Sequence, residues 1–421
     1  MSGRAVRPDA LRLREIRAGE AELRGLFERS GVDPAGAAIM ARKAVVRVIR
    51  IDDLSAPVAN ILKQLALAAG ADCANHGRVI LGEPERSTVH LVGHERQLRD
   101  LARRLAPQPF GLPHLGRAVT DLLDRLASPP RALALPGGPL SLEDGPRLMG
   151  IVNVTPDSFS DGGLWDDAGR AVEHGLRLAD EGADLLDVGG ESTRPGAAPV
   201  TPEEEARRVL PVIRELARRA GVPVSVDTRR AAVAREALDA GAVMVNDVTA
   251  LGDPDMAPLV AAAGAACALM HMRGDPETMQ DDPRYDDPVD EIHRWLGERA
   301  AAAMAAGIAP ERLLVDPGIG FGKRVEDNTA LIRRLGEFHS LGLPLLLGAS
   351  RKSFLGALMD EPDPQRRLEG SLAAAARAVE QDVHVLRVHD VAATRRFLAA
   401  WRPLCEDAGA AAAAWSAPGE A

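Results

Sequence analysis

The chain has 421 residues, of which 46% are hydrophobic and 27% charged. This is an ordinary globular composition that excludes a disordered or fibrous protein. The formal net charge of −10 argues against a general nucleic-acid binder, which needs a basic surface to displace phosphate counterions. No apolar run reaches the roughly 20 residues of a membrane span, and the charged start lacks the apolar stretch of a secretory signal. Three widely spaced cysteines predict neither a disulfide framework nor a thiolate zinc site. We therefore expect a cytoplasmic enzyme or binding protein with neither nucleic acid nor membrane as a partner.

Residues 1–128 are predicted to form an N-terminal extension, with polar helices first and a small α+β domain after them. Short apolar runs predict three strands, at 45–52, 78–81 and 89–93. Amphipathic patterns predict helices between and after these strands, at 56–71, 94–106 and 115–127. The stretch 129–146 is rich in Pro and Gly and predicts a linker. The role of the extension stays open among structural support, oligomerisation and regulation, with packing or assembly preferred.

From residue 147 to 403 the pattern changes to short apolar runs that alternate with amphipathic helices. The apolar runs are 148–154, 183–190, 222–227, 242–247, 266–272, 312–318, 343–350 and 383–390. Nearly continuous hydrophobicity is typical of parallel strands covered on both faces. Eight strand–helix units in about 250 residues predict a (β/α)8 TIM barrel, with a doubly wound open sheet as the alternative. Residues 404–421 are of low complexity and predict a disordered tail.

The helix after the second run has a start signal that shows how these units are built. Thr201 is in position to cap its N-terminus, and Pro202 is suited to its first turn. Glu204 is predicted to complete a capping box with Thr201.

Every predicted strand of the barrel ends in hydrogen-bonding or charged side chains. In chain order these are Asn153, Asp187, Asp227, Asn246 with Asp247, His271, Asp316, Ser350 to Lys352, and Arg387 with His389. Active sites of TIM barrels lie at this end of the strands. We therefore expect these side chains to converge on one cavity that binds a polar heterocycle together with an anion.

A polar residue at a strand end has a second possible role, because many such residues only cap the following helix. For Asp390, capping is the preferred interpretation. Asp227 and Asn246 favour a functional role, since Thr228 can cap in place of Asp227 and Asn is unfavourable inside a strand. Asp187 and His271 stay open between a functional and a structural role.

Three loops carry more specific chemistry, at 153–163, 189–197 and 348–353. The last offers cations and small hydroxyl residues at a helix start, a combination suited to phosphate or carboxylate. Lys352 is informative there, because the chain has only four lysines among 51 basic residues. The glycines of 316–323 do not have the spacing of a dinucleotide-binding fingerprint.

These loops resemble the motifs of the dihydropteroate synthase family. The motifs are LMGIVNVTPDSFSDGG, DLLDVGGESTRPGA, SVDT, VNDV, LMHMRGDPETMQ, DPGIGFGK, GASRKS and RVHD, and they span about 148–400. The resemblance implies a TIM-barrel transferase of folate synthesis. Such an enzyme condenses 6-hydroxymethyl-7,8-dihydropterin diphosphate with 4-aminobenzoate, giving 7,8-dihydropteroate and diphosphate, with Mg2+ as cofactor.

The resemblance also implies roles for individual residues. A pterin pocket is implied for Asp227, Asn246, Met270, Asp316 and Lys352. Diphosphate binding is implied for Thr193, Arg194, Arg387 and His389, with Arg194, Lys352, Arg387 and His389 as the catalytic set. The 4-aminobenzoate pocket would consist of Phe159, Pro195, Phe321 and Ser353, and Asn153 would be the Mg2+ ligand.

Two other functions compete with this interpretation. A methyltetrahydrofolate-dependent corrinoid methyltransferase also binds a pterin in such a barrel, but it handles no diphosphate. A non-catalytic pterin-binding paralogue would be free to lose Lys352 or Arg194, both of which are present. We also expect a homodimer.

Overall fold

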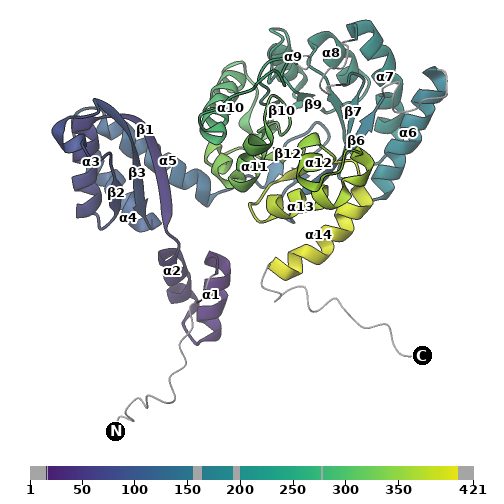
Figure 1. The fold of residues 1–421 in the computed structure, drawn as a ribbon. Coiled ribbons are helices and arrows are strands. Elements are labelled where there is room, and N and C mark those ends of the chain that lie inside the picture. Colours follow the sequence, from purple (N-terminus) through teal and green to yellow (C-terminus); the bar gives the residue numbers. More distant parts are fainter. Residues whose placement is uncertain (1–15, 17, 155–163, 193–199, 276–277, 406–421) are drawn as a thin grey trace, which may run out of the picture. The chain divides into compact units, whose positions relative to one another are not determined.

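The computed structural model describes residue 16 and residues 18–154, 164–192, 200–275 and 278–405. The chain divides into two compact units, Met1–Asp124 and Arg125–Ala421, and each is described here by itself (Figure 1). No helix within the described ranges is long and apolar enough to cross a membrane.

The first unit combines a helical pair with a small antiparallel sheet. The pair is α1 (Glu20–Arg29) and α2 (Pro34–Ala44). The sheet has the order β1-β3-β2, with β1 (Arg47–Ser55), β3 (Arg86–Gly93) and β2 (Asp72–Ala74). The helices that pack with it are α3 (Ala56–Ala68), α4 (Glu95–Leu105) and α5 (Leu112–Ala127). Leu62, Leu91, Leu98 and Leu101 are completely buried in its core, so the predicted α+β extension is confirmed.

One predicted strand of this unit is wrong. Residues 78–81 were expected to be extended, but Val79–Leu81 form a single 3-10 turn. Ile80 and Leu81 are 79% and 71% exposed, and only Val79 is buried. A short apolar run does not distinguish a strand from a helical turn. The third strand is instead β2, a three-residue element that the apolar pattern did not reveal.

The second unit is an eight-stranded parallel barrel. Its strands are β6 (Arg147–Asn153), β7 (Leu185–Gly189), β8 (Val224–Asp227), β9 (Met244–Asp247), β10 (Ala266–Met270), β11 (Leu313–Asp316), β12 (Leu346–Leu347) and β13 (Val385–Val388). Their order is β11-β10-β9-β8-β7-β6-β13-β12. A parallel bridge between Val315 and Leu345 closes the ring. This closure confirms the TIM barrel over the doubly wound sheet, and each predicted apolar run contains a strand.

Helices surround the barrel, as Figure 1 shows. They are α6 (Leu164–Asp180), α7 (Pro202–Arg219), α8 (Ala231–Asp239), α9 (Met256–Ala263), α10 (Pro288–Ala305), α11 (Val325–Arg333), α12 (Ser353–Met359), α13 (Leu368–Val379) and α14 (Val391–Cys405). Their apolar faces and the outward side chains of the strands form the largest hydrophobic core. The predicted tail from 406 onward lies outside the described residues.

The start of α7 follows the predicted pattern in part. The Thr201 side chain accepts a hydrogen bond of 3.2 Å from the Glu204 N–H, and Pro202 occupies the first turn. The Glu204 carboxylate binds Arg207 and Arg208 on the next turn of the helix. Two nearby guanidinium groups compete for this carboxylate, so the second half of the predicted capping box is replaced by ion pairs.

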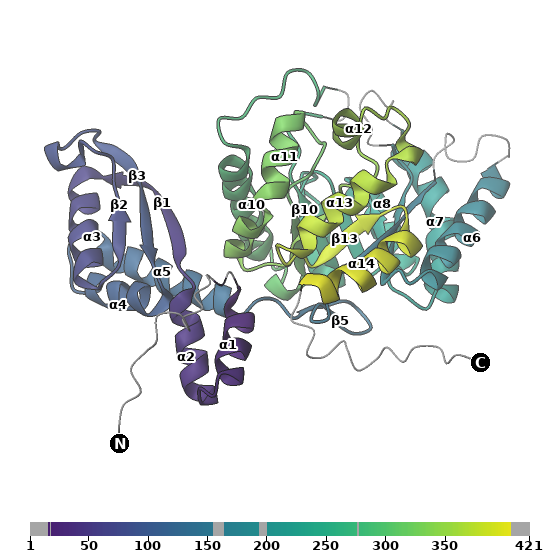
Figure 2. The ribbon, with the colours of Figure 1, turned by 60° about the horizontal axis from the view of Figure 1, so that its bottom comes forward.

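The stretch 129–146 belongs to the barrel unit and is more than a linker. It forms a hairpin of β4 (Ala132–Leu133) and β5 (Leu140–Ser141). Leu133 and Leu142 of this stretch pack against the inward side chains at the start of the barrel strands, including Met149 and Leu185. Figure 2 shows β5 beneath the barrel, at the end opposite α12. The Pro and Gly residues therefore form the turns of a plug that closes the barrel floor.

Candidate active site

The inner face of the barrel changes from apolar to polar along β7 and β9. Because side chains alternate between the two faces of a strand, the inward positions of β7 are Leu185, Asp187 and Gly189. Leu185 belongs to the apolar floor, whereas Asp187 is a completely buried carboxylate one layer higher. The same change occurs on β9, from Met244 in the floor to Asn246 above it. The polar layer thus lies at the carboxyl ends of the strands, as predicted.

Arg387 is the centre of this polar layer. Its Nε donates to Asp187 Oδ2 over 2.6 Å, and its Nη2 donates to Asp227 Oδ2 over 2.8 Å. Burial disfavours a charged guanidinium, but Asp187 and Asp227 outweigh this effect and raise the pKa of Arg387. Burial raises the pKa of Asp227 to about 7, although Arg387 acts in the opposite direction. Three strands therefore share one charge network.

Asp187 and Asn246 extend this network to a fourth strand. Asn246 Nδ2 donates to Asp187 Oδ2 over 2.9 Å, and both side chains are buried. The sequence left Asp187 open between ligand binding and helix capping. Its contacts are with Arg387 and Asn246, and α7 begins only at Pro202. Asp187 is therefore part of the site, although the prediction did not include it among the site residues.

Asp316 and Lys352 lie beside this network. Asp316 Oδ1 accepts a hydrogen bond of 2.7 Å from the Gly318 N–H, and burial raises the pKa of this carboxyl. The Lys352 ammonium donates to the Ile319 carbonyl and lies 4.2 Å from the centre of the Phe321 ring. Burial lowers the pKa of Lys352 to about 7, with Asp316 acting in the opposite direction. Lys352 as a whole is half-buried.

The glycines of 316–323 allow this close packing. Gly318 has a φ of +68°, and a Cβ there would lie 1.9 Å from the His271 carbonyl oxygen. Gly320 has a φ of +82°, and its Cβ would lie 3.0 Å from Lys352 Cδ. Both positions favour glycine for backbone conformation, and at Gly318 the His271 carbonyl also leaves no space for a Cβ. The loop is thus a rigid cradle for Lys352 and not a dinucleotide-binding turn.

His271 has a structural role in this arrangement. Its Nδ1 lies 3.0 Å from Lys323 Nζ, and its ring packs edge-on against Trp295 at 4.9 Å. Burial and Lys323 lower the pKa of His271 to about 2. The histidine is therefore neutral near pH 7, and the question left open by the sequence is answered in favour of packing. Met270, which precedes it, is 4% exposed at the end of β10.

The remaining described candidates lie at strand ends or in the loops that follow them. The Ser350 hydroxyl lies 3.0 Å from His389 Nδ1 and also accepts the His389 N–H. Ser353 begins α12 and is exposed, while Phe321 is half-buried. Asn153 ends β6, where it pairs in register with Gly189, and is half-buried.

Asp390 does not fill the role that the sequence favoured. Both oxygens of its carboxylate bind Arg351, with one distance of 2.9 Å. The predicted helix cap is replaced by an ion pair that joins the ends of two neighbouring strands.

Four predicted site residues lie outside the described residues: Phe159, Thr193, Arg194 and Pro195. The positions on either side of 193–199 are, however, held together. Glu191 accepts the Val200 N–H over 3.2 Å and pairs with Arg230 over 2.8 Å. Arg230 also donates to the Val200 carbonyl over 2.8 Å and binds the buried Glu205. No sequence pattern predicts this cluster, because its members come from three separate loops and helices.

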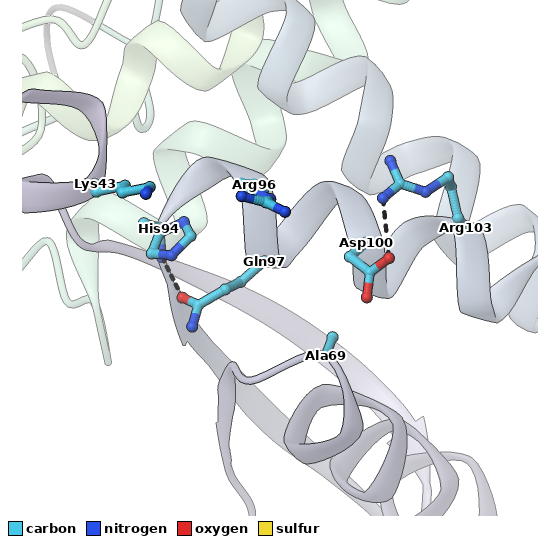
Figure 3. A pocket seen from close by; sticks show the side chains of 7 residues that line it. All are labelled: Lys43, Ala69, His94, Arg96, Gln97, Asp100 and Arg103. Atoms are coloured by element: carbon cyan, nitrogen blue, oxygen red, sulfur yellow. Dashed lines mark hydrogen bonds and ion pairs between the residues drawn. The ribbon is translucent and has the colours of Figure 1, made fainter. Parts of the chain in front are cut away.

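The first unit contains a cavity of about 480 Å³ (Figure 3). It is lined by Lys43, Ala69, His94, Arg96, Gln97, Asp100 and Arg103. Asp100 and Arg103 pair with each other over 2.9 Å. None of the seven lining side chains is buried. We assign no ligand to this cavity.

Comparison with known proteins places the barrel in a family. A sequence model described as "Pterin binding enzyme" matches residues 149–389. The dihydropteroate synthase of Escherichia coli K12 is 50% identical over 249 residues, which are 59% of this chain and 88% of that protein. The chain belongs to the dihydropteroate synthase family. This membership does not favour the corrinoid methyltransferase or the non-catalytic paralogue.

Solved structures of the family are similar to the barrel unit. The Xanthomonas albilineans enzyme with 4-aminobenzoic acid is 51% identical with a TM-score of 0.62, covering 66% of this chain and 98% of that one. Its complex with 7,8-dihydropteroate is 49% identical with a TM-score of 0.60, covering 65% and 98%.

One relative also shares residues of the extension. A probable bifunctional folylpolyglutamate synthase/dihydropteroate synthase of Haloferax volcanii is 39% identical over 380 residues, covering 88% of this chain and 45% of that protein. This alignment is longer than the 297 residues from Arg125 to Ala421. Part of the first unit therefore has a counterpart in that relative.

Proposed function

We propose that the chain condenses 6-hydroxymethyl-7,8-dihydropterin diphosphate with 4-aminobenzoate, releasing 7,8-dihydropteroate and diphosphate for folate synthesis. One observation carries this proposal: Arg387, Asp187, Asp227 and Asn246 converge in one hydrogen-bonded network. This network, with Lys352 beside it, offers acceptors for a heterocycle and cations for an anion. The ligands of the solved relatives, 4-aminobenzoic acid and 7,8-dihydropteroate, are a substrate and the product of this reaction.

Recognition of the pterin is assigned to acceptor groups in the polar layer. A pterin ring presents N–H donors along its pyrimidine edge, and a carboxylate is a strong acceptor for such donors. Asp316 Oδ1 is engaged by Gly318, so Oδ2 is the oxygen assigned to the ligand. Asp227 and Asn246 supply further polar contacts, and Met270 supplies an apolar wall.

Cationic side chains are assigned to stabilise the diphosphate as it leaves. Breaking the C–O bond separates a cationic pterin methylene from an anionic leaving group, so preorganised positive charge stabilises the transition state. Arg387, Lys352 and His389 are the described candidates, and Arg194 is the candidate outside the described residues. Arg387 is already fixed by two carboxylates, so little reorganisation accompanies the reaction. A substrate anion favours the protonated form of Lys352, whose pKa of about 7 makes this response large.

The family resemblance implies Mg2+ as a cofactor. Within the described ranges, this chain offers one candidate ligand for it. Among the described residues, no group of three or more His, Cys, Asp or Glu side chains could hold a metal ion. Asn153 offers one hard amide oxygen at the end of β6. Mg2+ commonly binds through one or two protein groups together with substrate phosphates and water. Bound in that way, Mg2+ would neutralise charge on the diphosphate, with Asn153 as its protein ligand.

The second substrate is assigned to the loops that follow the barrel strands. Phe321 and Ser353 are the described candidates, with Phe159 and Pro195 as the others. The neutral amine of 4-aminobenzoate is already a nucleophile, so no strong base is required. Its nitrogen forms the new bond to the pterin methylene, the C–O bond to diphosphate breaks, and the amine releases one proton to solvent.

Location and assembly complete the proposal. We place the enzyme in the cytoplasm, in keeping with an acidic composition and with substrates of central metabolism. We expect a homodimer, which light scattering of the purified protein tests directly.

The assay uses purified protein, both substrates and Mg2+, and follows dihydropteroate and diphosphate together. Equal amounts of the two products are expected, and Arg387→Ala is the matched inactive control. Methyl transfer to a corrinoid without diphosphate release would support the competing methyltransferase instead. Pterin binding without any turnover would support the non-catalytic paralogue.

A further inference from the structure

Asp187 lies in the polar layer beneath the strand ends. It is completely buried on β7, where it pairs in register with Ile151 of β6 and Ser225 of β8. Its side chain nevertheless binds groups from strands two positions away on either side, β13 and β9. Asp187 therefore ties together parts of the barrel that the backbone ladder does not join directly.

A single oxygen makes both contacts. Oδ2 accepts from Arg387 Nε over 2.6 Å and from Asn246 Nδ2 over 2.9 Å. Oδ1 is buried and has no hydrogen-bond partner in the part of the chain that the structure describes. The orientations of Arg387 and Asn246 are thus set by the same atom, so a change at Asp187 displaces both.

The contact fixes which end of the Asn246 amide faces the ligand. An ionised carboxylate only accepts hydrogen bonds, so the nitrogen of Asn246 must face Asp187. The amide oxygen is then the end available as an acceptor. A ligand that presents an N–H at this position is favoured over one that presents a bare ring nitrogen.

The contact also divides the charge of Arg387 between two carboxylates. Asp227 binds Nη2 while Asp187 binds Nε. Burial raises the pKa of Asp227, and the charge of Asp187 raises it further. If Asp187 were neutral, Asp227 would be the one carboxylate paired with Arg387. The pKa of Asp227 would then fall, because the nearby negative charge that raises it is gone.

We propose that Asp187 is a positioning residue that orients Arg387 for the diphosphate and Asn246 for the pterin. This inference rests on the proposed function and deepens it, because it assigns a role to a residue that the family resemblance did not include. Asp187 does not itself contact substrate in this scheme. Its effect reaches the reaction through the two side chains that it holds.

The test compares Asp187→Asn with the wild type in steady-state kinetics. We expect kcat/KM for the pterin diphosphate to fall by about 10²-fold, the loss typical of one preorganised contact at a charged transition state. The KM for 4-aminobenzoate should stay within about twofold, since its pocket lies elsewhere. The pH profile of pterin binding should move to lower pH, because the pKa of Asp227 falls. A variant with wild-type kcat/KM and an unmoved pH profile overturns the inference.

Asp184→Asn, at the start of the same strand, is the matched control. Asp184 precedes β7 and binds the Leu148 N–H and Arg395, each over 2.7 Å. Its replacement should lower stability and leave the pH profile unchanged. A shift of the pH profile in this control equal to that of Asp187→Asn also overturns the inference.

A second variant, Asp187→Glu, covers the case in which Asp187→Asn does not fold. It keeps the carboxylate and leaves Arg387 and Asn246 unchanged, but one added methylene displaces the oxygen that both side chains bind. If Asp187 only stabilises the fold, the folded Asp187→Glu protein keeps wild-type pterin affinity, which refutes the proposal. If Asp187 positions Arg387 and Asn246, pterin affinity falls at least about tenfold in the folded variant. Absence of turnover in the wild type would refute the proposed function, whereas the pterin-binding measurements still decide the positioning role.

Discussion

Asp227→Asn is expected to stabilise the barrel while it weakens the enzyme. Burial raises the pKa of Asp227 from 3.8 to about 7. The folded protein therefore binds more protons than the unfolded chain between about pH 4 and pH 7, and ionisation of this carboxyl opposes folding increasingly as pH rises. A shift of about 3 units at 1.36 kcal/mol each gives an upper value of about 4 kcal/mol at pH 8. At pH 5 the same linkage gives about 2 kcal/mol. The neutral, isosteric amide removes this cost.

Urea unfolding followed by tryptophan fluorescence measures this effect in the barrel alone. All four tryptophans, Trp165, Trp295, Trp401 and Trp415, lie in the second unit. The free energy of unfolding of the variant should exceed that of the wild type, with a larger difference at pH 8 than at pH 5. Turnover should fall at both pH values.

A second carboxylate serves as a control, because its replacement by Asn should change stability in the opposite direction. Asp287 caps α10 and pairs with Arg334 over 3.0 Å. Burial acts to raise the pKa of Asp287, but Arg334 and backbone N–H groups outweigh it and lower the pKa. Asp287→Asn should therefore destabilise the barrel above pH 4, and the loss should fade as pH falls through the folded-state pKa. Equal changes for Asp227→Asn at pH 5 and pH 8, or a loss of stability at pH 8, would refute the reasoning.

Three further predictions concern the site and the domain organisation. Lys352→Ala and Arg387→Ala should each reduce turnover by about 10²-fold or more, while the far-ultraviolet circular dichroism spectrum stays unchanged. Near-normal activity in either variant would contradict the assignment of that residue to the active site. A chelator of Mg2+ should stop diphosphate release, and release that is indifferent to the chelator would remove Asn153 from the scheme. Deletion of 1–128 should leave a folded barrel. Deletion of 1–140 also removes the buried Leu133, so the free energy of unfolding measured in urea should be lower by about 2–5 kcal/mol. Equal stability of the two truncated proteins would contradict the role of the hairpin as a barrel floor.

Much of the barrel could be predicted because its signals are local. Each strand is a short apolar run, and the next helix begins with turn residues and a cap such as Thr201. Parallel strands place their carboxyl ends at one edge, so the convergence of Asp227, Asn246 and Arg387 followed from chain order alone. These inferences needed no knowledge of side-chain contacts.

The parts that could not be predicted depend on contacts between distant residues. Asp187 and Arg387 are 200 positions apart, and only the closed ring brings them together. The hairpin at 129–146 was hidden because Pro and Gly are common to linkers and to tight turns. Asp390 was assigned to capping because a strand end predicts a helix start, whereas its partner Arg351 lies on the preceding strand's loop.

The most direct measurement is a crystal structure of the protein soaked with a dihydropterin ligand. We predict that the ring lies among the strand ends of the barrel, with its N–H donors within hydrogen-bond distance of Asp316, Asp227 or the Asn246 oxygen. Its 6-substituent should point toward Arg387 and Lys352. A ring bound in the cavity of the first unit, or bound in the barrel without contact to these side chains, would contradict it.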